Sequence, residues 1–412
     1  MAALGWHLAA RDHDVTLAVP DEFRALGEGA GLRTARLPFD LASWLATPEG
    51  QRLLQRGGMA VMRGVASQYS RRADALDEAH EAAASGAEAL VGALLTVDRA
   101  QALGDRLRVP VATVFQMPVV PSREYASLLL TKGGRRPGLL CRASNDLAYR
   151  VWWYGNAKAT NAFRRKLGLP RSPRPTYYRM QENAAPGLHT FSPSLFPRPS
   201  DWPDNLLVTG AWEMPAALRD SVGERLPAEL QSWLDAGDPP VFLGFGSMPV
   251  LDPQPLLDDI ASVTRALGRR AIVSENCVGK GAATALPDHL YAVGAVDHDR
   301  LFPQCAAVVH HGGLGSTTAS LRAGQPTMVC SVFGDQPWWG EQLRRLGVGA
   351  HVPFRKLDRR TLGAGLRSLL EPATEARARS LGETMTAEGD GLPAAARFLE
   401  DWLVTAEPTP LR

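Results

Sequence analysis

The sequence predicts an α/β protein with two domains, each built on a parallel sheet. The chain has 412 residues, more than one hydrophobic core holds, because single cores stop growing at roughly 250–300 residues. In both halves short apolar runs alternate with helical patterns, the order that produces parallel strands joined by helices. The composition, 45% hydrophobic and 21% charged, is that of an ordinary globular protein able to form such cores.

The second half has the clearest strands. A buried run at Val241–Phe245 precedes a helical pattern from about 254 to 267. The further strands expected there are 271–273, 290–293, 306–309, 327–330 and 348–352. Five or six parallel strands with intervening helices predict a Rossmann-like domain.

The first half alternates in the same way and predicts a second α/β layer. Its expected elements are a helix through Leu4 and Leu8, a strand at 15–19, a helix from Glu22, a strand at 32–37, helices over 53–84, and strands at 89–95 and 111–115. Open parallel sheets usually begin with a strand, whereas this chain opens inside a helix. We therefore expect the first strand and its loop to be absent from this domain.

A proline-rich passage at 192–203 separates the halves, since closely spaced prolines prevent a helix from continuing. The expected organisation is an N-terminal domain over 1–205, a linker over 206–240 and a C-terminal domain over 241–412. The last helix, near 393–403, has Phe398, Leu399 and Trp402 on one side. We expect it to cross back to the N-terminal domain.

Charge and cysteine content exclude several classes of protein. There are 45 Lys and Arg residues against 43 Asp and Glu, a net charge of +2, which is too small to favour nucleic acid as a partner. No apolar run is long enough for a transmembrane segment, and the start lacks the pattern of a signal peptide. The four cysteines have no zinc-like spacing. Reduced thiols fit a cytoplasmic protein.

The strongest chemical signal is a glycine-rich turn between the strand at 306–309 and a following helix, with the sequence His310-His311-Gly312-Gly313. Glycines allow close approach of a ligand, and the free N–H groups and dipole of a helix N-terminus favour an anion. An ordinary turn with a Ser or Thr cap is the alternative. Successive side chains on an extended backbone point to opposite sides, so one histidine is expected to pack and His311 to face the ligand.

Two other strand exits carry polar residues. Gly244-Phe245-Gly246-Ser247 follows the strand at 241–245 and is either a plain turn or a ligand loop in which Ser247 bonds phosphate. Asp335 and Gln336 follow the strand at 327–330, where they match vicinal sugar hydroxyls, or Asp335 acts as a helix N-cap before Pro337. In an open sheet, loops at the carboxyl ends of strands converge on one ligand.

Two tripeptides and one aromatic cluster have simpler explanations. Asp297-His298-Asp299 and Asp12-His13-Asp14 match a metal-binding DxD pattern, but nearby element starts explain them as turns and caps. We therefore expect no metal site. The aromatic cluster over 149–154 is helically spaced, which favours core packing over a groove for an apolar acceptor.

The run from Val296 to Gln336, with its His310-His311-Gly312-Gly313 turn, resembles the donor-binding signature of the family 1 glycosyltransferases. The bacterial antibiotic and sterol-type enzymes are the most similar in pattern. The resemblance covers nearly the whole chain. It implies the GT-B fold, in which two Rossmann-like domains bind a nucleotide-sugar in the C-terminal domain and an acceptor in the N-terminal one.

The resemblance also implies roles for individual residues. His311 would contact the donor diphosphate, the backbone near Val296 would hold the base, and Ser247 would reach the phosphates. Further donor contacts are expected from the glycine-rich turn and the residues after the third strand exit: Gly313, Gly315, Ser316, Thr317, Asp335 and Gln336. The family needs no cofactor or metal when the helix dipole and an imidazole stabilise the diphosphate.

The implied reaction is inverting transfer of a hexose or deoxyhexose from a UDP- or dTDP-sugar to a hydroxyl of a small apolar acceptor. The acceptor would be a natural product (a polyketide, macrolide or glycopeptide) or a lipid-like or sterol-like molecule. The family's catalytic His or Asp lies in the loop that we expect to be absent, and His7 lies within a predicted helix. We assign no catalytic base and predict no oligomeric state.

Two alternatives remain open from the sequence. One is a nucleotide-sugar-binding or auxiliary protein without turnover, which the expected loss of the first loop would favour. The other is a nucleotide-sugar epimerase of the same architecture, which would need no acceptor. The adjacent Asp335 and Gln336 favour transfer.

Overall fold

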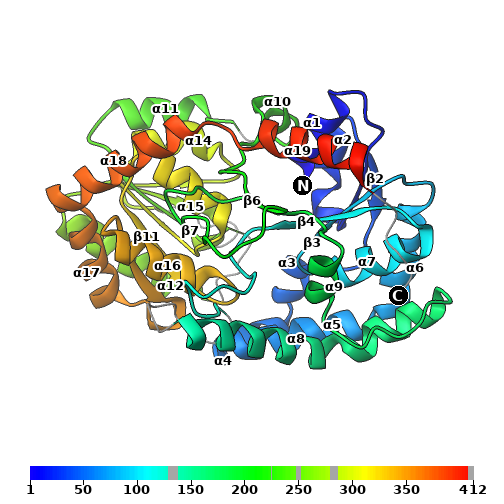
Figure 1. Cartoon of the computed structure of the whole chain (residues 1–412). Coiled ribbons are helices and arrows are strands. Elements are labelled where there is room, and N and C mark those ends of the chain that lie inside the picture. Colours follow the sequence, from blue (N-terminus) through cyan, green and yellow to red (C-terminus); the bar gives the residue numbers. More distant parts are fainter. Residues whose placement is uncertain (129–137, 224, 247–251, 279–285, 407–412) are drawn as a thin grey trace. The chain divides into compact units, whose positions relative to one another are not determined.

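The structure is a computed structural model, and it describes residues 1–128, 138–223, 225–246, 252–278 and 286–406. These residues form two compact units. Unit 1 comprises Met1–Asp40, Ser67–Leu218 and Glu388–Arg412, and unit 2 comprises Leu41–Ala66 and Arg219–Ala387. Both combine helices with parallel strands, which confirms the predicted α/β class (Figure 1).

Unit 2 contains a six-stranded sheet, and every strand pair in it is parallel. The strands are β7 (Val241–Gly244), β8 (Ala271–Ser274), β9 (Leu290–Val293), β10 (Ala307–His310), β11 (Thr327–Ser331) and β12 (Gly349–Pro353). Their order is β12-β11-β10-β7-β8-β9, the doubly wound order of a Rossmann-like domain. All six strands predicted for the second half are therefore confirmed to within a residue or two.

The inner strands of this sheet could be predicted from the sequence because they are buried. Every residue of β7, β10 and β11 is buried. A parallel strand covered on both faces reads as a continuous apolar run. The edge strands β9 and β12 are only partly buried.

Helices cover both faces of the unit 2 sheet (Figure 1). Side chains of α11, α14 and α15 form one core cluster with β7, β8 and β10, while α16 and α17 contact β11 and β12. The helices are α11 (Ala228–Asp235), α12 (Pro253–Ala266), α13 (Glu275–Val278), α14 (His298–Leu301), α15 (Leu314–Arg322), α16 (Gln336–Leu346), α17 (Arg359–Leu369) and α18 (Pro372–Glu388).

Unit 1 has two separate parallel sheets among its described residues, β1-β2 and β3-β4-β5-β6. The strands are β1 (Thr16–Val19), β2 (Arg33–Arg36), β3 (Leu90–Ala93), β4 (Val111–Phe115), β5 (Gly187–His189) and β6 (Leu206–Val208). The first four match the predicted strands. β5 and β6 were not predicted, and β6 lies in the segment that we expected to be a linker.

The helices that lie wholly in unit 1 include long and short segments. They are α1 (Ala2–Ala9), α2 (Arg24–Gly29), α6 (Ala73–Ala84), α7 (Val97–Leu107), α8 (Gly138–Lys166), α9 (Thr176–Glu182) and α19 (Leu392–Thr405). Three further helices belong to Leu41–Ala66 or cross a boundary between units: α3 (Leu41–Leu45), α4 (Pro48–Arg56) and α5 (Gly58–Arg71). The boundary at Leu218 lies within α10 (Ala216–Ser221).

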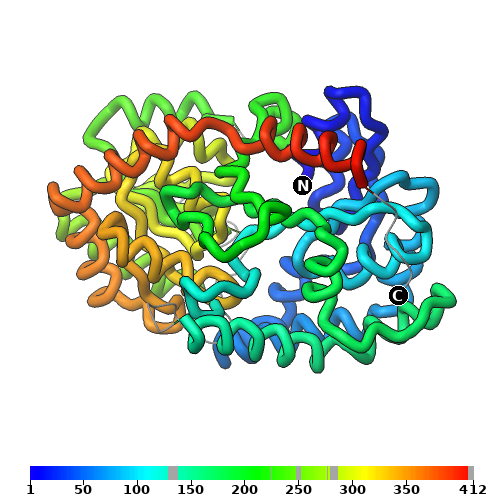
Figure 2. The backbone as a smooth tube through the Cα atoms, viewed as in Figure 1, coloured from blue at the N-terminus to red at the C-terminus, as the bar shows by residue number. Residues whose placement is uncertain are grey.

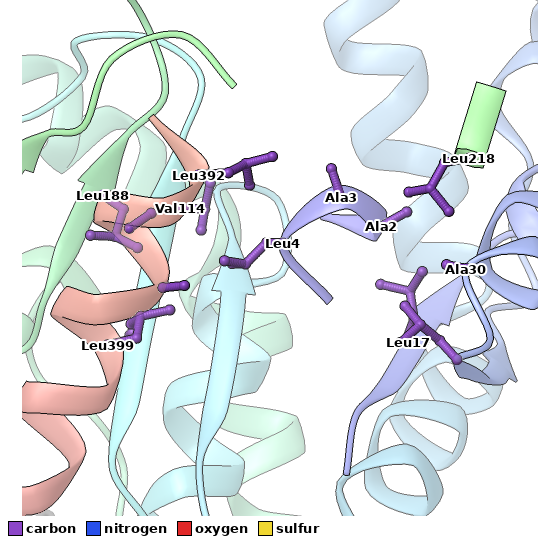
Figure 3. Close-up of a cluster of buried hydrophobic side chains, with 14 residues drawn as sticks. Ala2, Ala3, Leu4, Leu17, Ala30, Val114, Leu188, Leu218, Leu392 and Leu399 are labelled. Atoms are coloured by element: carbon purple, nitrogen blue, oxygen red, sulfur yellow. The ribbon is translucent and has the colours of Figure 1, made fainter. Parts of the chain in front are cut away.

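The first and last helices close the core of unit 1. After α18 the chain returns to unit 1 as α19 (Figure 2), where α19 contacts α1. Leu392 and Leu399 of α19 lie in one buried cluster with Leu4 of α1 and with Val114 and Leu188 of the sheet (Figure 3). The last helix thus belongs to unit 1, to which most of the N-terminal half belongs.

Among the described residues, no helix combines the length and the apolar character that crossing a membrane requires.

Candidate functional site

The strand order of unit 2 places a topological switch point between β7 and β10. From β7 the chain continues to β8 and β9 on one side, and it returns at β10 on the other side. His310 pairs with Gly244 in the register of these strands, so the loops that follow them begin side by side. Ligands of open α/β sheets bind in the crevice at such a point.

The imidazole of His311 lies between the backbones of these two loops. A Cβ atom at Gly246 would be 2.9 Å from Cε1 of His311, and one at Gly313 would be 2.7 Å from its Nε2. Gly246 also has a φ of 59°, a left-handed conformation that favours glycine. Both glycines are therefore needed for His311 to occupy this position.

His311 is a neutral imidazole at neutral pH. Burial lowers its pKa to about 4, because desolvation disfavours the charged ring. Its Nδ1 atom is buried and has no hydrogen-bond partner in the described part of the chain. A neutral ring with an unused nitrogen can donate or accept one hydrogen bond to a ligand.

His310 has a different role, as expected for the neighbouring residue on an extended backbone. It is 1% exposed, and its Nδ1 accepts a hydrogen bond from the N–H of Gly312 at 2.9 Å. Burial holds the pKa of His310 well below its usual value. The ring therefore shapes the turn into α15, and His310 is the histidine that packs.

Gly312 brings a second loop against this turn. Its φ is 96°, and a Cβ there would be 2.5 Å from Cγ1 of Val329 and 3.2 Å from Cβ of Gln336. The start of α16 thus lies close to the turn before α15. The loops that follow β7, β10 and β11 meet at one edge of the sheet.

Helix α15 begins at Leu314, shortly after His311. Gly313 is the N-cap and no side chain caps the helix. The N–H of Thr317 bonds back to the carbonyl of Gly313, which leaves the preceding N–H groups of the first turn without intrahelical acceptors. Such N–H groups and the helix dipole favour an anion.

The predicted residues of α15 differ in their surroundings. Gly315 is exposed, and no atom lies within 4 Å of where its Cβ would be. Ser316 is half-buried. Thr317 is fully buried, and its hydroxyl donates to the Gly313 carbonyl at 2.9 Å. Ser247 lies outside the described residues.

Asp335 and Gln336 form the third part of the site. Oε1 of Gln336 accepts hydrogen bonds from the N–H groups of Val332 at 2.7 Å and Phe333 at 3.1 Å, so this oxygen is committed to holding the loop. Oδ2 of Asp335 accepts from Nε1 of Trp339 at 2.8 Å. Asp335 occupies the N-cap position, but its side chain makes no capping hydrogen bond.

Burial also changes the acidity of Asp335. Its pKa is raised to about 6, because desolvation disfavours the carboxylate more than the Trp339 hydrogen bond favours it. Near neutral pH the group is a carboxylate with one indole donor. It can accept further hydrogen bonds from hydroxyl groups.

Val296 lies in the short turn between β9 and α14. It is 6% exposed and belongs to the core cluster of the sheet. The Asp297 carboxylate caps α14, accepting from the N–H of Asp299 at 2.9 Å. Within the described residues, no group of three or more His, Cys, Asp or Glu side chains could hold a metal ion.

Two residues beside this turn, His298 and Arg219, have contacts that sequence analysis did not identify. His298 stacks on Phe302 with ring centroids 4.4 Å apart, and burial lowers its pKa to about 4. Arg219 forms ion pairs with Asp297 and Asp299. His298 and Phe302 are four positions apart, a spacing that indicates contact on one face of a helix. Nothing near Arg219 in the sequence indicated its partners.

Comparison with known proteins identifies the family of the chain. The family described as "Erythromycin biosynthesis protein CIII-like, C-terminal domain" matches residues 260–397. An O-mycaminosyltylonolide 6-deoxyallosyltransferase of Streptomyces fradiae is 35% identical, covering 98% of this chain and 94% of the relative. An uncharacterized glycosyltransferase of Mycobacterium leprae is 32% identical, covering 97% and 93%.

Solved structures share the fold. The glycosyltransferase of kitacinnamycin superimposes with a TM-score of 0.70 at 18% identity, covering 98% of this chain and 95% of that one. A spinosyn rhamnosyltransferase complexed with thymidine diphosphate has a TM-score of 0.61 at 22% identity, covering 97% and 95%. The GT-B fold expected from the sequence is thus confirmed. By its sequence and its fold, the chain belongs to the family 1 glycosyltransferases and is a transferase enzyme.

Proposed function

We propose that this enzyme transfers a hexose or deoxyhexose, with inversion, from a dTDP- or UDP-sugar to a hydroxyl of a natural product. The acceptor class includes polyketides, macrolides and glycopeptides, and lipid-like or sterol-like molecules as the broader alternative. The observation that carries the proposal is the position of His311. Its ring lies against Gly246 and Gly313, at the switch point and beside the open N-terminus of α15.

This arrangement suits a diphosphate that becomes a leaving group. The N–H groups of the first turn of α15 donate to phosphate oxygens, and the helix dipole favours their charge. His311 adds a hydrogen bond from a neutral ring. These donors are fixed before the reaction, so they stabilise the charge that develops on the departing nucleoside diphosphate. On this proposal the enzyme uses no metal and no cofactor.

On this proposal Asp335 and Gln336 recognise the sugar. The Asp335 carboxylate has acceptor capacity beyond its bond to Trp339. The Oε1 atom of Gln336 is already bonded to the loop, so its amide NH2 is the group left for a sugar oxygen. Hydroxyls on adjacent sugar carbons match this acceptor and donor pair.

The names of the related proteins support the choice of substrates. The Streptomyces fradiae relative is a 6-deoxyallosyltransferase that acts on O-mycaminosyltylonolide, and one spinosyn rhamnosyltransferase structure contains thymidine diphosphate. Both sugars named there are deoxyhexoses. We infer a dTDP- or UDP-linked sugar and an apolar hydroxylated acceptor for this chain.

The reaction follows from direct displacement. The acceptor hydroxyl loses its proton to a base and attacks the anomeric carbon from the face opposite the diphosphate, which inverts that carbon. We assign the base to no residue. The four cysteines are all free and buried, which supports the cytoplasm as the proposed compartment.

Calorimetric titration with UDP, dTDP and ADP tests the donor site. We expect the wild-type chain to bind UDP or dTDP in preference to ADP and His311→Ala to lose that binding. His13→Ala is the matched control, because His13 is an exposed histidine of unit 1 paired with Glu400. Wild-type affinity in His311→Ala would contradict the proposal, as would the absence of nucleotide binding by the wild type.

A further inference from the structure

Two carboxylates lie at the start of α14, Asp297 at its N-cap and Asp299 in its first turn, in the unit that holds the proposed donor site. Asp297 is 6% exposed, and its Oδ1 accepts from the N–H groups of Asp299 at 2.9 Å and Arg300 at 3.4 Å. Asp299 follows two residues later on the surface. A buried carboxylate is stable only where hydrogen bonds and a counter-charge compensate its desolvation.

Arg219 supplies that counter-charge to both groups. Its Nη1 lies 3.5 Å from Oδ1 of Asp297, and its Nη2 contacts Oδ2 of Asp299. The Arg219 side chain is only 14% exposed. The planar guanidinium presents its donors in a fixed fork, so one side chain holds two carboxylates at set positions.

Arg300, the second arginine near Asp297, makes a weaker ion pair. Nε of Arg300 lies 3.5 Å from Oδ2 of Asp297, but the Arg300 side chain is 61% exposed. Exposed pairs contribute little because water screens them. His298, between the two carboxylates, is neutral because burial lowers its pKa to about 4. Arg219 is therefore the main buried positive charge that the described residues supply here.

We propose that Arg219 is a positioning residue for the nucleoside of the donor: by clamping Asp297 and Asp299 it fixes the start of α14 and the adjoining turn, in which the backbone at Val296 would hold the base. The inference rests on the proposed function, since it concerns the same donor site. The clamp has a second effect. Two unneutralised carboxylates would repel a bound diphosphate, and the guanidinium offsets that charge.

The conservative substitution Arg219→Lys tests this role. Lysine keeps the charge and loses the fork, so it cannot hold both carboxylates in the same geometry. We expect its dissociation constant for the preferred nucleoside diphosphate, dTDP or UDP, to rise about tenfold or more, the loss typical of a hydrogen bond to a charged group. The binding stoichiometry should stay at the wild-type value, because lysine keeps the positive charge and the unit still folds.

Arg344→Lys is the matched control. Arg344 lies on α16 in the same unit and pairs with Glu341 at the surface, where its side chain is 60% exposed. This variant should bind the nucleotide as the wild type does. Arg219→Gln removes the charge as well and should weaken binding further.

Each outcome of the titration decides between roles. A merely structural Arg219 would lower the melting temperature and the fraction of binding-competent protein, leaving the dissociation constant unchanged, and that result would overturn the inference. Wild-type affinity and stoichiometry in Arg219→Lys would overturn it as well. If the wild-type chain itself bound neither dTDP nor UDP, the proposed function would fail first, so the two failures are distinguishable.

Discussion

Two neighbouring glycines of the site differ in what they permit. A Cβ at Gly313 would strike the His311 ring at 2.7 Å, whereas one at Gly315 would meet no atom within 4 Å. Gly313 is therefore required by the fold of the loop. Gly315 lies in the first turn of a helix with open space beside it, and glycine weakens a helix relative to alanine. A ligand bound in the space beside Gly315 would explain why this position has no side chain.

Gly315→Ala separates stability from binding. We expect the free energy of unfolding to increase by about 0.5–1 kcal/mol, because alanine is the better helix former. Affinity for dTDP or UDP should fall, because the methyl group would occupy the phosphate position. Denaturant unfolding and calorimetry measure the two effects.

Gly155→Ala is the control for this prediction. Gly155 lies inside α8, and nothing approaches within 4 Å of its Cβ position. The variant should gain similar stability and leave nucleotide binding unchanged. Unchanged affinity in Gly315→Ala would show that this glycine does not contact the donor.

Buried histidines make stability depend on pH. His189 is fully buried and stacked between Phe115 and Trp202, and burial lowers its pKa to about 3. In the unfolded chain His189 takes up a proton below a pH of about 6.5. In the folded chain it does so only near pH 3. Stability is thus lost as pH falls from 6.5 towards 3.

His189→Phe should reduce this acid sensitivity. Between pH 7 and pH 5 we expect the variant to lose about 2 kcal/mol less stability than the wild type, from the linkage of one such group. Denaturant titration at both pH values, followed by tryptophan fluorescence, measures the difference. An equal loss in both proteins would mean that His189 is protonated in the folded state.

Among the secondary-structure elements, α19 shows how a terminal helix contributes to a core that forms elsewhere in the sequence. Its face with Leu392, Ala395, Ala396 and Leu399 is buried in unit 1. The sequence revealed this apolar side. The periodicity of a helix indicates that one face is buried, but it does not indicate against what.

Leu399→Ala should destabilise unit 1. Leu399 is 2% exposed, and removing a buried leucine side chain costs about 2–5 kcal/mol because a cavity remains. Val404→Ala on the same helix is the control, since Val404 is 87% exposed and should change stability by less than about 0.5 kcal/mol. Thermal unfolding distinguishes them, and equal melting temperatures would place α19 outside the core.

For the whole molecule, the division into two units means that a bound donor should stabilise mainly one of them. All described residues of the proposed donor site belong to unit 2. A ligand that binds only the folded form stabilises the unit that holds it, by about 2.7 kcal/mol at one hundred times its dissociation constant. Binding should therefore protect the two units unequally.

Hydrogen exchange with and without dTDP or UDP measures this inequality. We expect slower exchange at the ends of β7, β10 and β11 and in the first turn of α15. Exchange in β3 to β6 of unit 1 should change much less. Equal protection of both units would show that the nucleotide stabilises the chain as one cooperative body.

The sequence by itself determined the strands of unit 2, the glycine-rich turn and the family. Buried parallel strands read as continuous apolar runs, and a positive φ or a close approach requires glycine, as at Gly246 and Gly312. Strands β5 and β6 were not predicted because each has only three residues, too few for a periodic pattern.

Tertiary structure alone decided which distant residues meet. Arg219 and Asp299 are 80 positions apart, and Leu41–Ala66 joins unit 2 although it precedes most of unit 1 in sequence. It also decided that the Gln336 oxygen is bonded within its own loop and that the Thr317 hydroxyl faces the helix backbone. Local patterns record how each segment is buried, whereas contacts between segments depend on how the whole chain folds back on itself.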